Sequence, residues 1–453
     1  MGTTRLRLTR WIAAVVVLAA VGCENQSPRR SALVITLDTT RADALSCLGG
    51  REGTTPVLDA LAGRSTLFVE ARSETNVTGP SHVTILSGQR AIDHGVHWNG
   101  APIPEGVETL PAVLQREGWS TAAFVASRHL SADLGWRGFD ALPAVEHQLT
   151  AREVTERALA WLRGEAGEPF FLWVHYWDPH MQYEPPPELV ARFYAGDPTA
   201  GSGPRVVDEP YFERFPRAGV REWLGDVRDP EWAKAMYAAE LHSADAEIGR
   251  LLAAAEEAAQ GELVVAVTAD HGESFGEHGI YYGHRGLYEP QLRVPLIVHV
   301  PGSPVQRAAD RVSTLDVAPT LAELLGVEFG GGVSGESLAA LVRDGAEVAA
   351  LADRVHVYEN ARNQGVAVRR GDWKLIVGLE RDHPLYAGPP QLYDLASDPG
   401  ETRNVAPEHP ERVAELTALL EPWLTLGVVQ HGTMPHLDDA AIERLRALGY
   451  LQE

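Results

Sequence analysis

The sequence is poor in cysteine and in basic residues, and its N-terminal apolar run is short. Cys23 and Cys47 are its 2 cysteines, too few for a disulfide-built scaffold. Lysine and arginine number 39 against 62 acidic residues, a formal charge of -23, which argues against nucleic acid as a partner. We find no internal repeat or low-complexity tract. These absences exclude a disulfide-rich scaffold, a polyanion-binding protein and a repeat array.

The length and composition are those of a large globular protein. The chain has 453 residues, of which 45% are hydrophobic and 22% are charged. This apolar content is enough to bury a sizeable core, and the length exceeds that of one compact domain. We therefore expect a large α/β domain with a smaller appended domain.

The N-terminus has the pattern of an export signal. Three arginines and no acidic residue precede or flank the apolar run Trp11 to Val21, which is too short to span a bilayer comfortably. Small residues then lead to Cys23, which resembles the lipobox of bacterial lipoproteins. We predict a signal peptide at 1–22, a lipid on Cys23, a tether at 23–31, and a protein anchored to the membrane of the bacterial cell envelope. An ordinary cleaved signal and a single anchor helix are the alternatives.

Apolar runs of strand length alternate with amphipathic segments over residues 32–330. This alternation predicts an α/β domain with a large, mainly parallel sheet between two layers of helices. The expected strands are Ala32–Leu37, Thr121–Val125, Phe170–His175, Leu263–Thr268 and Val294–Val300. The expected helices are Val107–Arg116, Val154–Leu162, Trp232–Ala255 and Leu315–Leu325.

Two further segments have a different character. Residues 181–232 are rich in proline and aromatic residues and are too long for a simple connection, so they form either a lid or an insertion without a role. From about Gly330 onward, alternating segments with turn signals precede helical patterns at Glu411–Leu420 and Asp439–Leu448. We predict a smaller C-terminal α+β subdomain over 331–453.

Polar residues follow three of the expected strands at the point where each strand ends. Asp38 follows the first strand, Asp178 and His180 follow the third, and Asp270 and His271 follow the fourth. Ligands of open α/β sheets collect beyond the carboxyl ends of the strands. The sequence therefore predicts one site, with groups of metal-ligand type, at this edge.

The segment Thr78-Gly79-Pro80-Ser81-His82 predicts a helix start beside that site. Pro80 suits the first turn of a helix, where its missing amide costs nothing. We expect Thr78 just before the helix, where the helix end favours an anion and a metal could help its hydroxyl attack an ester. The alternative is that Thr78 merely caps the helix.

Together these segments resemble the sulfatase family of the alkaline-phosphatase superfamily. The resemblance rests on the order and spacing of motifs along nearly the whole mature chain. They are Leu37-Asp38-Thr39-Thr40-Arg41-Ala42-Asp43, Thr78-Gly79-Pro80-Ser81-His82 with Leu86-Ser87-Gly88, His175-Tyr176-Trp177-Asp178-Pro179-His180, Thr268-Ala269-Asp270-His271-Gly272-Glu273, Leu287-Tyr288-Glu289, Gln391-Leu392-Tyr393-Asp394-Leu395, Glu401-Thr402-Arg403-Asn404 and Arg444-Leu445-Arg446-Ala447-Leu448-Gly449-Tyr450.

The resemblance implies an alkaline-phosphatase-like fold and a metal-dependent nucleophile. Asp38, Asp270 and His271 would be metal ligands, and the Thr78 oxygen would complete the site. This ligand set suits a hard or borderline divalent ion such as Ca, Mn or Zn. Whether one or two ions bind stays open at this point, since other polar residues could hold a second. The residues of that second set would be Asp178, His180 and His284.

Further residues are implied to act on the substrate. His180 would bind a nonbridging oxygen or serve as a general acid. The remaining substrate-binding candidates are Asn99, His129, His284 and His82.

The chain also departs from the family pattern. Sulfatases carry a Cys or Ser that matures to formylglycine, followed by an Arg, where this chain has Thr78 and His82. Formylglycine cannot form by that route. Thr39 replaces a common metal-binding Asp, while Ser127 and His284 stand where Lys is frequent. Threonine nucleophiles are typical of the superfamily's phosphodiesterase branch.

The prediction is a hydrolase of small anionic esters, either sulfate or phosphate and phosphonate esters, with Thr78 as the nucleophile. A transferase that passes the group from Thr78 to a lipid or glycan is one alternative. A noncatalytic binding protein that keeps the sulfatase frame is another.

Overall fold

The computed structural model describes residues 29–260, 262–330, 332–380 and 382–429. The predicted signal peptide, Cys23, most of the tether and the helix expected at Asp439–Leu448 lie outside these residues. Over the described part of the chain, no helix combines the length and the apolar character needed to cross a membrane.

A seven-stranded sheet forms the centre of the molecule, with the order β3-β4-β1-β5-β8-β2-β9. Among the paired strands, β8 alone runs antiparallel to its neighbours, so the predicted large, mainly parallel sheet is confirmed. The strands are β1 (Ser31–Leu37), β2 (Thr66–Arg72), β3 (Ser120–Val125), β4 (Phe170–Tyr176), β5 (Leu263–Ala269), β8 (Leu296–His299) and β9 (Gln306–Ser313).

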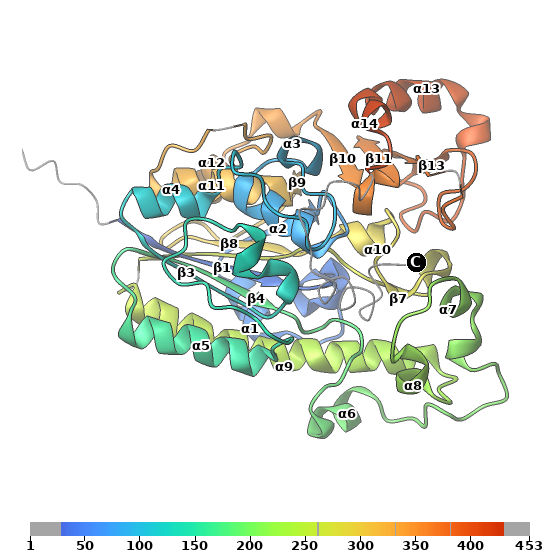
Figure 1. Ribbon diagram of the computed structural model, residues 1–453, viewed down its shortest axis with the longest axis horizontal. Helices are drawn as coiled ribbons and strands as arrows, with labels where there is room; N and C mark the ends of the chain where they lie inside the picture. Colours follow the sequence, from blue (N-terminus) through green and yellow to red (C-terminus); the bar gives the residue numbers. More distant parts are fainter. Residues whose placement is uncertain (1–28, 261, 331, 381, 430–453) are drawn as a thin grey trace, which may run out of the picture.

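The central strands β1, β4 and β5 are buried at every position. Helices cover both of their faces, and a strand buried on both faces is apolar along its whole length. In Figure 1, α5 and α9 cover one face, while α2, α4, α11 and α12 lie on the other. These helices are α2 (Thr78–Ser87), α4 (Leu110–Arg116), α5 (Ala151–Gly164), α9 (Pro230–Ala258), α11 (Val317–Leu325) and α12 (Ala339–Asp344). Three further helices are α1 (Pro56–Ala62), α3 (Ala91–His94) and α10 (Glu289–Leu292).

A second, four-stranded antiparallel sheet with two helices forms the C-terminal subdomain (Figure 1). Its elements are β10 (Val355–Glu359), β11 (Gly365–Arg370), β12 (Trp373–Gly378), β13 (Gln391–Asp394), α13 (Pro410–Ala418) and α14 (Glu421–Leu426). Leu338, Val342 and Leu351 still pack in the main core. The change of domain therefore falls later in the chain than the expected boundary at residue 330.

The proline-rich insertion 181–232 folds into short helices that pack with their own aromatic cluster. It contains α6 (Pro187–Phe193), α7 (Pro210–Arg214) and α8 (Val220–Leu224). Phe212 and Leu224 share this cluster with Tyr282, which lies in the small hairpin of β6 (Ser274–Phe275) and β7 (Tyr281–Gly283). The insertion is thus attached to the loops that follow β5.

Candidate active site

Three potential metal ligands meet at the carboxyl ends of two neighbouring strands. Asp38 follows β1, while Asp270 and His271 follow β5, and the two strands pair up to Leu37 and Ala269. All three side chains are 0% exposed. One ligand atom from each lies within 4.8 Å of the others. The fold thus brings these three residues together, as the sequence predicts.

The atoms of this group that face one another have no hydrogen-bond partner. They are Asp38 Oδ1, Asp270 Oδ2 and His271 Nε2. The other atoms are occupied: Asp270 Oδ1 accepts from the Thr39 amide at 3.1 Å and from the His271 amide at 2.8 Å. Because His271 Nδ1 donates to the Gly272 carbonyl at 3.0 Å, its Nε2 carries the lone pair.

Electrostatics also favour a cation there. Burial raises the pKa of Asp38, and the charge of Asp270 raises it further. Two buried carboxylates with unsatisfied oxygens and an imidazole lone pair fit a divalent ion of the hard or borderline kind. The Thr39 hydroxyl donates to the Pro179 carbonyl.

Thr78 is the first residue of α2 and is 1% exposed. The residue before the helix is Val77, with extended backbone, and no side chain caps the helix. Thr78 therefore lies in the first turn of the helix and not, as predicted from the sequence, just before it. The alternative that Thr78 caps the helix is wrong. Ser81, one turn further on, donates to the Asp270 carbonyl at 2.7 Å, so α2 is fastened to the loop that carries the ligands.

Asn99 and His129 lie beside the start of α2. Asn99 Oδ1 accepts from the Gly79 amide at 2.7 Å, and its buried Nδ2 has no partner. A side chain at Gly79 would come within 3.2 Å of that Oδ1 and 3.7 Å of the His129 carbonyl, which explains the glycine. The His129 ring is buried, and burial lowers its pKa to about 4. Asn99 therefore offers a free donor next to Thr78.

His82 does not face the site. Its Nδ1 donates to the Thr78 carbonyl at 2.8 Å, and its Nε2 lies 3.0 Å from the Thr36 hydroxyl. Burial lowers its pKa to about 3, which keeps the ring neutral. With both nitrogens satisfied and the side chain 0% exposed, His82 supports the first turn of α2, and its predicted contact with substrate is not supported.

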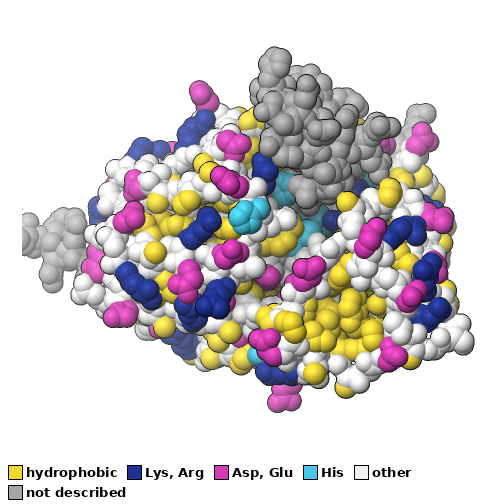
Figure 2. All heavy atoms as spheres, turned by 60° about the horizontal axis from the view of Figure 1, so that its bottom comes forward, with side chains coloured by type: hydrophobic (Ala, Val, Ile, Leu, Met, Phe, Trp, Pro, Cys, Tyr) yellow, Lys and Arg dark blue, Asp and Glu magenta, His cyan; other side chains and the backbone are white. Residues whose placement is uncertain are grey.

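His180 and His284 present the same tautomer. His180 Nδ1 donates to the Met181 carbonyl at 2.7 Å, and His284 Nδ1 donates to the Asn76 carbonyl at 2.7 Å. Each Nε2 therefore carries a lone pair, and that of His180 is buried without a partner. The His284 ring stacks on His271, with centroids 4.1 Å apart, and lies 6.1 Å from the His180 ring. In Figure 2 histidine side chains gather in a hollow of the face shown.

Asp178 does not join these histidines. Its Oδ2 accepts from the Ala151 amide at 2.8 Å, at the start of α5. Within the described residues, Asp38, Asp270 and His271 form the one group of three ligand-type side chains that converges. The second metal set considered for Asp178, His180 and His284 is therefore not assembled.

Two buried residues near the site were missed from the sequence. His175 Nδ1 accepts from the Ala126 amide at 3.3 Å, so its Nε2 donates to Asp38 Oδ2, also at 3.3 Å. Glu273 accepts from the Tyr183 hydroxyl, and burial raises its pKa to about 7. Both lie within motifs of the family resemblance, but their roles depend on partners far away in the sequence.

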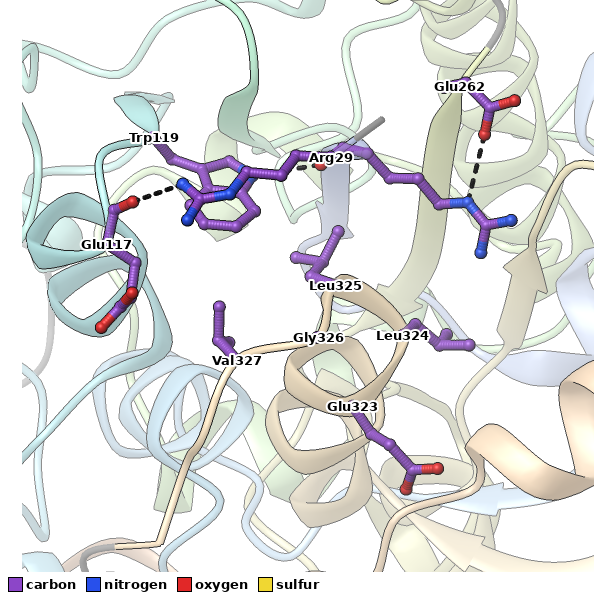
Figure 3. Close-up of a pocket in the computed structure, with 10 residues that line it drawn as sticks. Arg29, Glu117, Trp119, Glu262, Glu323, Leu324, Leu325, Gly326 and Val327 are labelled. Atoms are coloured by element: carbon purple, nitrogen blue, oxygen red, sulfur yellow. Dashed lines mark hydrogen bonds and ion pairs between the residues drawn. The ribbon is translucent and has the colours of Figure 1, made fainter. Parts of the chain in front are cut away.

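A separate hollow opens at the opposite edge of the sheet, where the strands begin (Figure 3). Arg29 donates to the Glu117 carbonyl at 2.6 Å and lies 4.6 Å from the Trp119 ring centroid. Arg30 donates to Glu262 at 3.2 Å. Because both arginines already have partners, they hold the start of the described chain in place, and the residues around this hollow show no reactive arrangement.

The fold is an α/β sheet flanked by helices, with three buried potential metal ligands at the carboxyl edge of the sheet. The chain belongs to the sulfatase family, because the family model described as "Sulfatase" matches residues 30–327. A second model, "N-sulphoglucosamine sulphohydrolase, C-terminal", matches residues 276–425. The predicted resemblance is thereby confirmed.

Individual relatives cover most of the chain at low identity. N-acetylglucosamine-6-O-sulfatase of Bacteroides thetaiotaomicron is 23% identical, over 90% of this chain and 89% of the relative. The multifunctional alkaline phosphatase superfamily protein PehA of Trinickia caryophylli is 24% identical, over 83% of this chain and 91% of the relative. The crystal structure of phosphonate monoester hydrolase of Agrobacterium radiobacter matches with a TM-score of 0.70 and 22% identity, covering 88% of this chain and 95% of that one. This structural match confirms the predicted fold.

Proposed function

We propose that this protein hydrolyses small sulfate, phosphate or phosphonate esters with Thr78 as its nucleophile. The observation that carries the proposal is the group of three buried, unpartnered ligand atoms beside the helix that begins at Thr78. Buried polar atoms without partners are rare in folded proteins, and each one here calls for a ligand.

Asp38, Asp270 and His271 would hold one divalent cation. When bound, such an ion stabilises negative charge on an ester oxygen and favours ionisation of a neighbouring hydroxyl. His175 holds the Asp38 carboxylate through its Nε2 proton, at 3.3 Å, and so fixes the direction in which the free oxygen points.

Thr78 loses its hydroxyl proton to water and attacks the sulfur or phosphorus, and the bond to the leaving oxygen breaks as the new bond forms. The free Asn99 Nδ2, beside the start of α2, donates to a nonbridging oxygen. Water then attacks the sulfur or phosphorus and breaks its bond to the Thr78 oxygen. This step releases sulfate, phosphate, a phosphate monoester or a phosphonate, according to the substrate, and the Thr78 oxygen regains a proton from the attacking water.

His180 supplies the proton that the leaving oxygen needs. Burial and the charge of Arg217 lower its pKa, so the ring is neutral and its Nε2 has a lone pair. An anionic ester beside Nε2 favours the protonated ring and opposes that shift. The proton then passes from Nε2 to the departing oxygen. His129 and His284 are further contacts for the anionic group.

Two names among the relatives define the substrate classes to test. One relative is named a 6-O-sulfatase, and a structural neighbour is a phosphonate monoester hydrolase. Threonine favours the phosphorus esters, because a sulfated threonine lacks the aldehyde-forming release that formylglycine provides. We therefore expect phosphonate monoesters or phosphodiesters to be turned over faster than aryl sulfates.

The test is a panel of aryl sulfate, phosphate monoester, phosphodiester and phosphonate ester, each assayed with Ca²⁺, Mn²⁺ or Zn²⁺. Thr78→Ala should reduce turnover by about 1,000-fold or more, while Thr78→Ser, which keeps a hydroxyl, should stay within about tenfold of the wild type. Full activity of Thr78→Ala would overturn the assignment. Product analysis with and without an added alcohol or glycan separates hydrolysis from the transferase alternative.

The N-terminal pattern adds a location to the proposal. We propose that Cys23 carries a lipid and anchors the protein to the bacterial cell envelope, as the lipobox-like residues before it predict. Labelling with a radioactive or clickable fatty acid should mark the wild type, whereas Cys23→Ser should be unlabelled and released from membranes.

A further inference from the structure

Arg217 lies in the insertion 181–232, between α7 and α8, and reaches the loops that carry two active-site histidines. Its Nη1 donates to the Tyr282 carbonyl at 3.0 Å and lies 4.0 Å from Met181 Sδ. Met181 follows His180 directly, and Tyr282 precedes His284 by two positions. The insertion thus places a guanidinium at the border of the proposed site.

The charge of Arg217 is not neutralised by an ion pair with any described residue. Arg41, another half-buried arginine near the site, pairs with Asp43 at 2.8 Å and with Glu277 at 2.7 Å. No carboxylate of the described chain lies within 4.0 Å of Arg217. Its charge also contributes to lowering the pKa of His180 and that of His284, after burial.

An unpaired guanidinium is unusual in a chain with a formal charge of -23. Its partial burial weakens solvation, so a ligand anion gains more from it than from a fully exposed arginine. Both hydrogen-bonding contacts of its side chain use Nη1, which leaves Nε and Nη2. That pair of donors matches the two oxygens of a carboxylate, sulfate or phosphate.

We propose that Arg217 binds a second anionic group, carried by the leaving portion of the substrate, and so selects esters with two negative charges. This inference rests on the proposed function, because the first anion is the ester that Thr78 attacks. Arg217 contacts the residues next to His180 and His284 and comes from the insertion. Its position therefore suits the organic part of the substrate better than the reacting oxygens.

The experiment measures binding in the inactive Thr78→Ala background, so that it does not depend on turnover. The probes are phenyl sulfate and 4-carboxyphenyl sulfate, together with the two corresponding phosphates, in calorimetric titrations with the metal added. With Arg217 intact, the carboxylated member of a pair should bind about tenfold more tightly. Arg217→Gln should abolish that preference, and Arg217→Lys should restore part of it.

Arg221→Gln is the matched control, because Arg221 is exposed on α8 of the same insertion. It should keep the full preference. Equal weakening of both probes by Arg217→Gln, an unchanged preference, or no binding of any probe by the parent would each overturn the proposal. Thermal unfolding of each variant shows whether a loss of binding reflects misfolding. The proposed function is tested separately, in the wild type with Thr78 intact. If the wild type hydrolyses no ester but the Thr78→Ala protein still prefers the carboxylated probes, the proposed function is refuted and the role of Arg217 stands.

Discussion

The active site and the contact between the two sheets both bury charged side chains, but they balance them in opposite ways. Between the sheets, Lys374 Nζ lies 3.1 Å from Glu289 and 2.7 Å from Glu401, and all three are largely buried. At the site, Asp38 and Asp270 are buried beside each other, and each has an oxygen without a partner.

The pKa shifts follow this difference. Although burial alone would raise the pKa of Glu289, the charges of Arg72 and Lys374 hold it well below its usual range. The pKa of Asp38 is instead raised, by burial and then by the charge of Asp270. Paired buried charges join the two domains, whereas like charges without partners mark the place where a cation belongs.

The largest effect is expected from neutralising one acid of the site. Asp38→Asn should lower kcat/KM by about 1,000-fold or more, because a metal ligand is lost. In the metal-free protein the same change should raise the free energy of unfolding by about 1 kcal/mol, since it removes repulsion between buried carboxylates. Activity assays and chemical denaturation after treatment with a chelator measure the two effects. A metal-free variant less stable than the wild type would contradict this account.

A similar change between the sheets should act on stability alone. Lys374→Met leaves Glu401 buried without its cation and should cost about 3 kcal/mol. Lys234→Met is the control, because Lys234 is exposed in its pair with Glu231, at 2.6 Å, and should change stability by less than about 0.5 kcal/mol. Urea unfolding measures both. Equal effects of the two substitutions would show that the buried pair contributes no more than a surface pair.

Glu74, a buried acid near the second sheet, should have an effect on stability that depends on pH. Its carboxyl accepts from the Ser313 hydroxyl at 2.5 Å, but it lies 4.0 Å from Arg90. Burial raises its pKa from 4.5 to about 7. Its contribution to stability is therefore present below about pH 4.5 and is lost as the pH rises through 7.

Glu74→Gln should remove this dependence, since an amide cannot ionise. The stability of the wild type relative to the variant should fall by about 3 kcal/mol over that pH range. Thermal or urea unfolding at a series of pH values measures the difference. A difference that stays constant with pH would show that folding leaves the pKa of Glu74 unchanged.

The centre of the large sheet could be predicted because three of its strands are runs of mainly apolar residues, buried at every position. β1, β4 and β5 have this pattern, and the ligands Asp38, Asp270 and His271 follow directly from where two of these strands end. β2 and β9 were missed. β9 is an edge strand with polar residues along its length, and β2 ends in Glu70, Ala71 and Arg72.

The missed polar residues act through partners that are distant in the sequence. Arg72 pairs with Glu289 at 2.6 Å, and no local pattern announces such a contact. Arg217 was missed for the same reason, because the insertion has no periodicity that predicts which of its arginines faces inward. His82 shows the opposite error: its place in a family motif suggested a contact with substrate, whereas it supports the helix from behind.

The anchoring of Arg29 and Arg30 at the amino edge of the sheet fixes how a lipid-anchored form of the protein would stand on a membrane. β1 carries the chain from that edge to Asp38, a rise of roughly 23 Å for a strand of this length. A lipid on Cys23 would be joined to Arg29 by a few residues, a reach of at most about 20 Å.

The edge tied down by Arg29 and Arg30 would therefore rest toward the bilayer, with the mouth of the catalytic centre pointing into the surrounding fluid. In such a form, diffusible esters in that fluid would have direct access to the site.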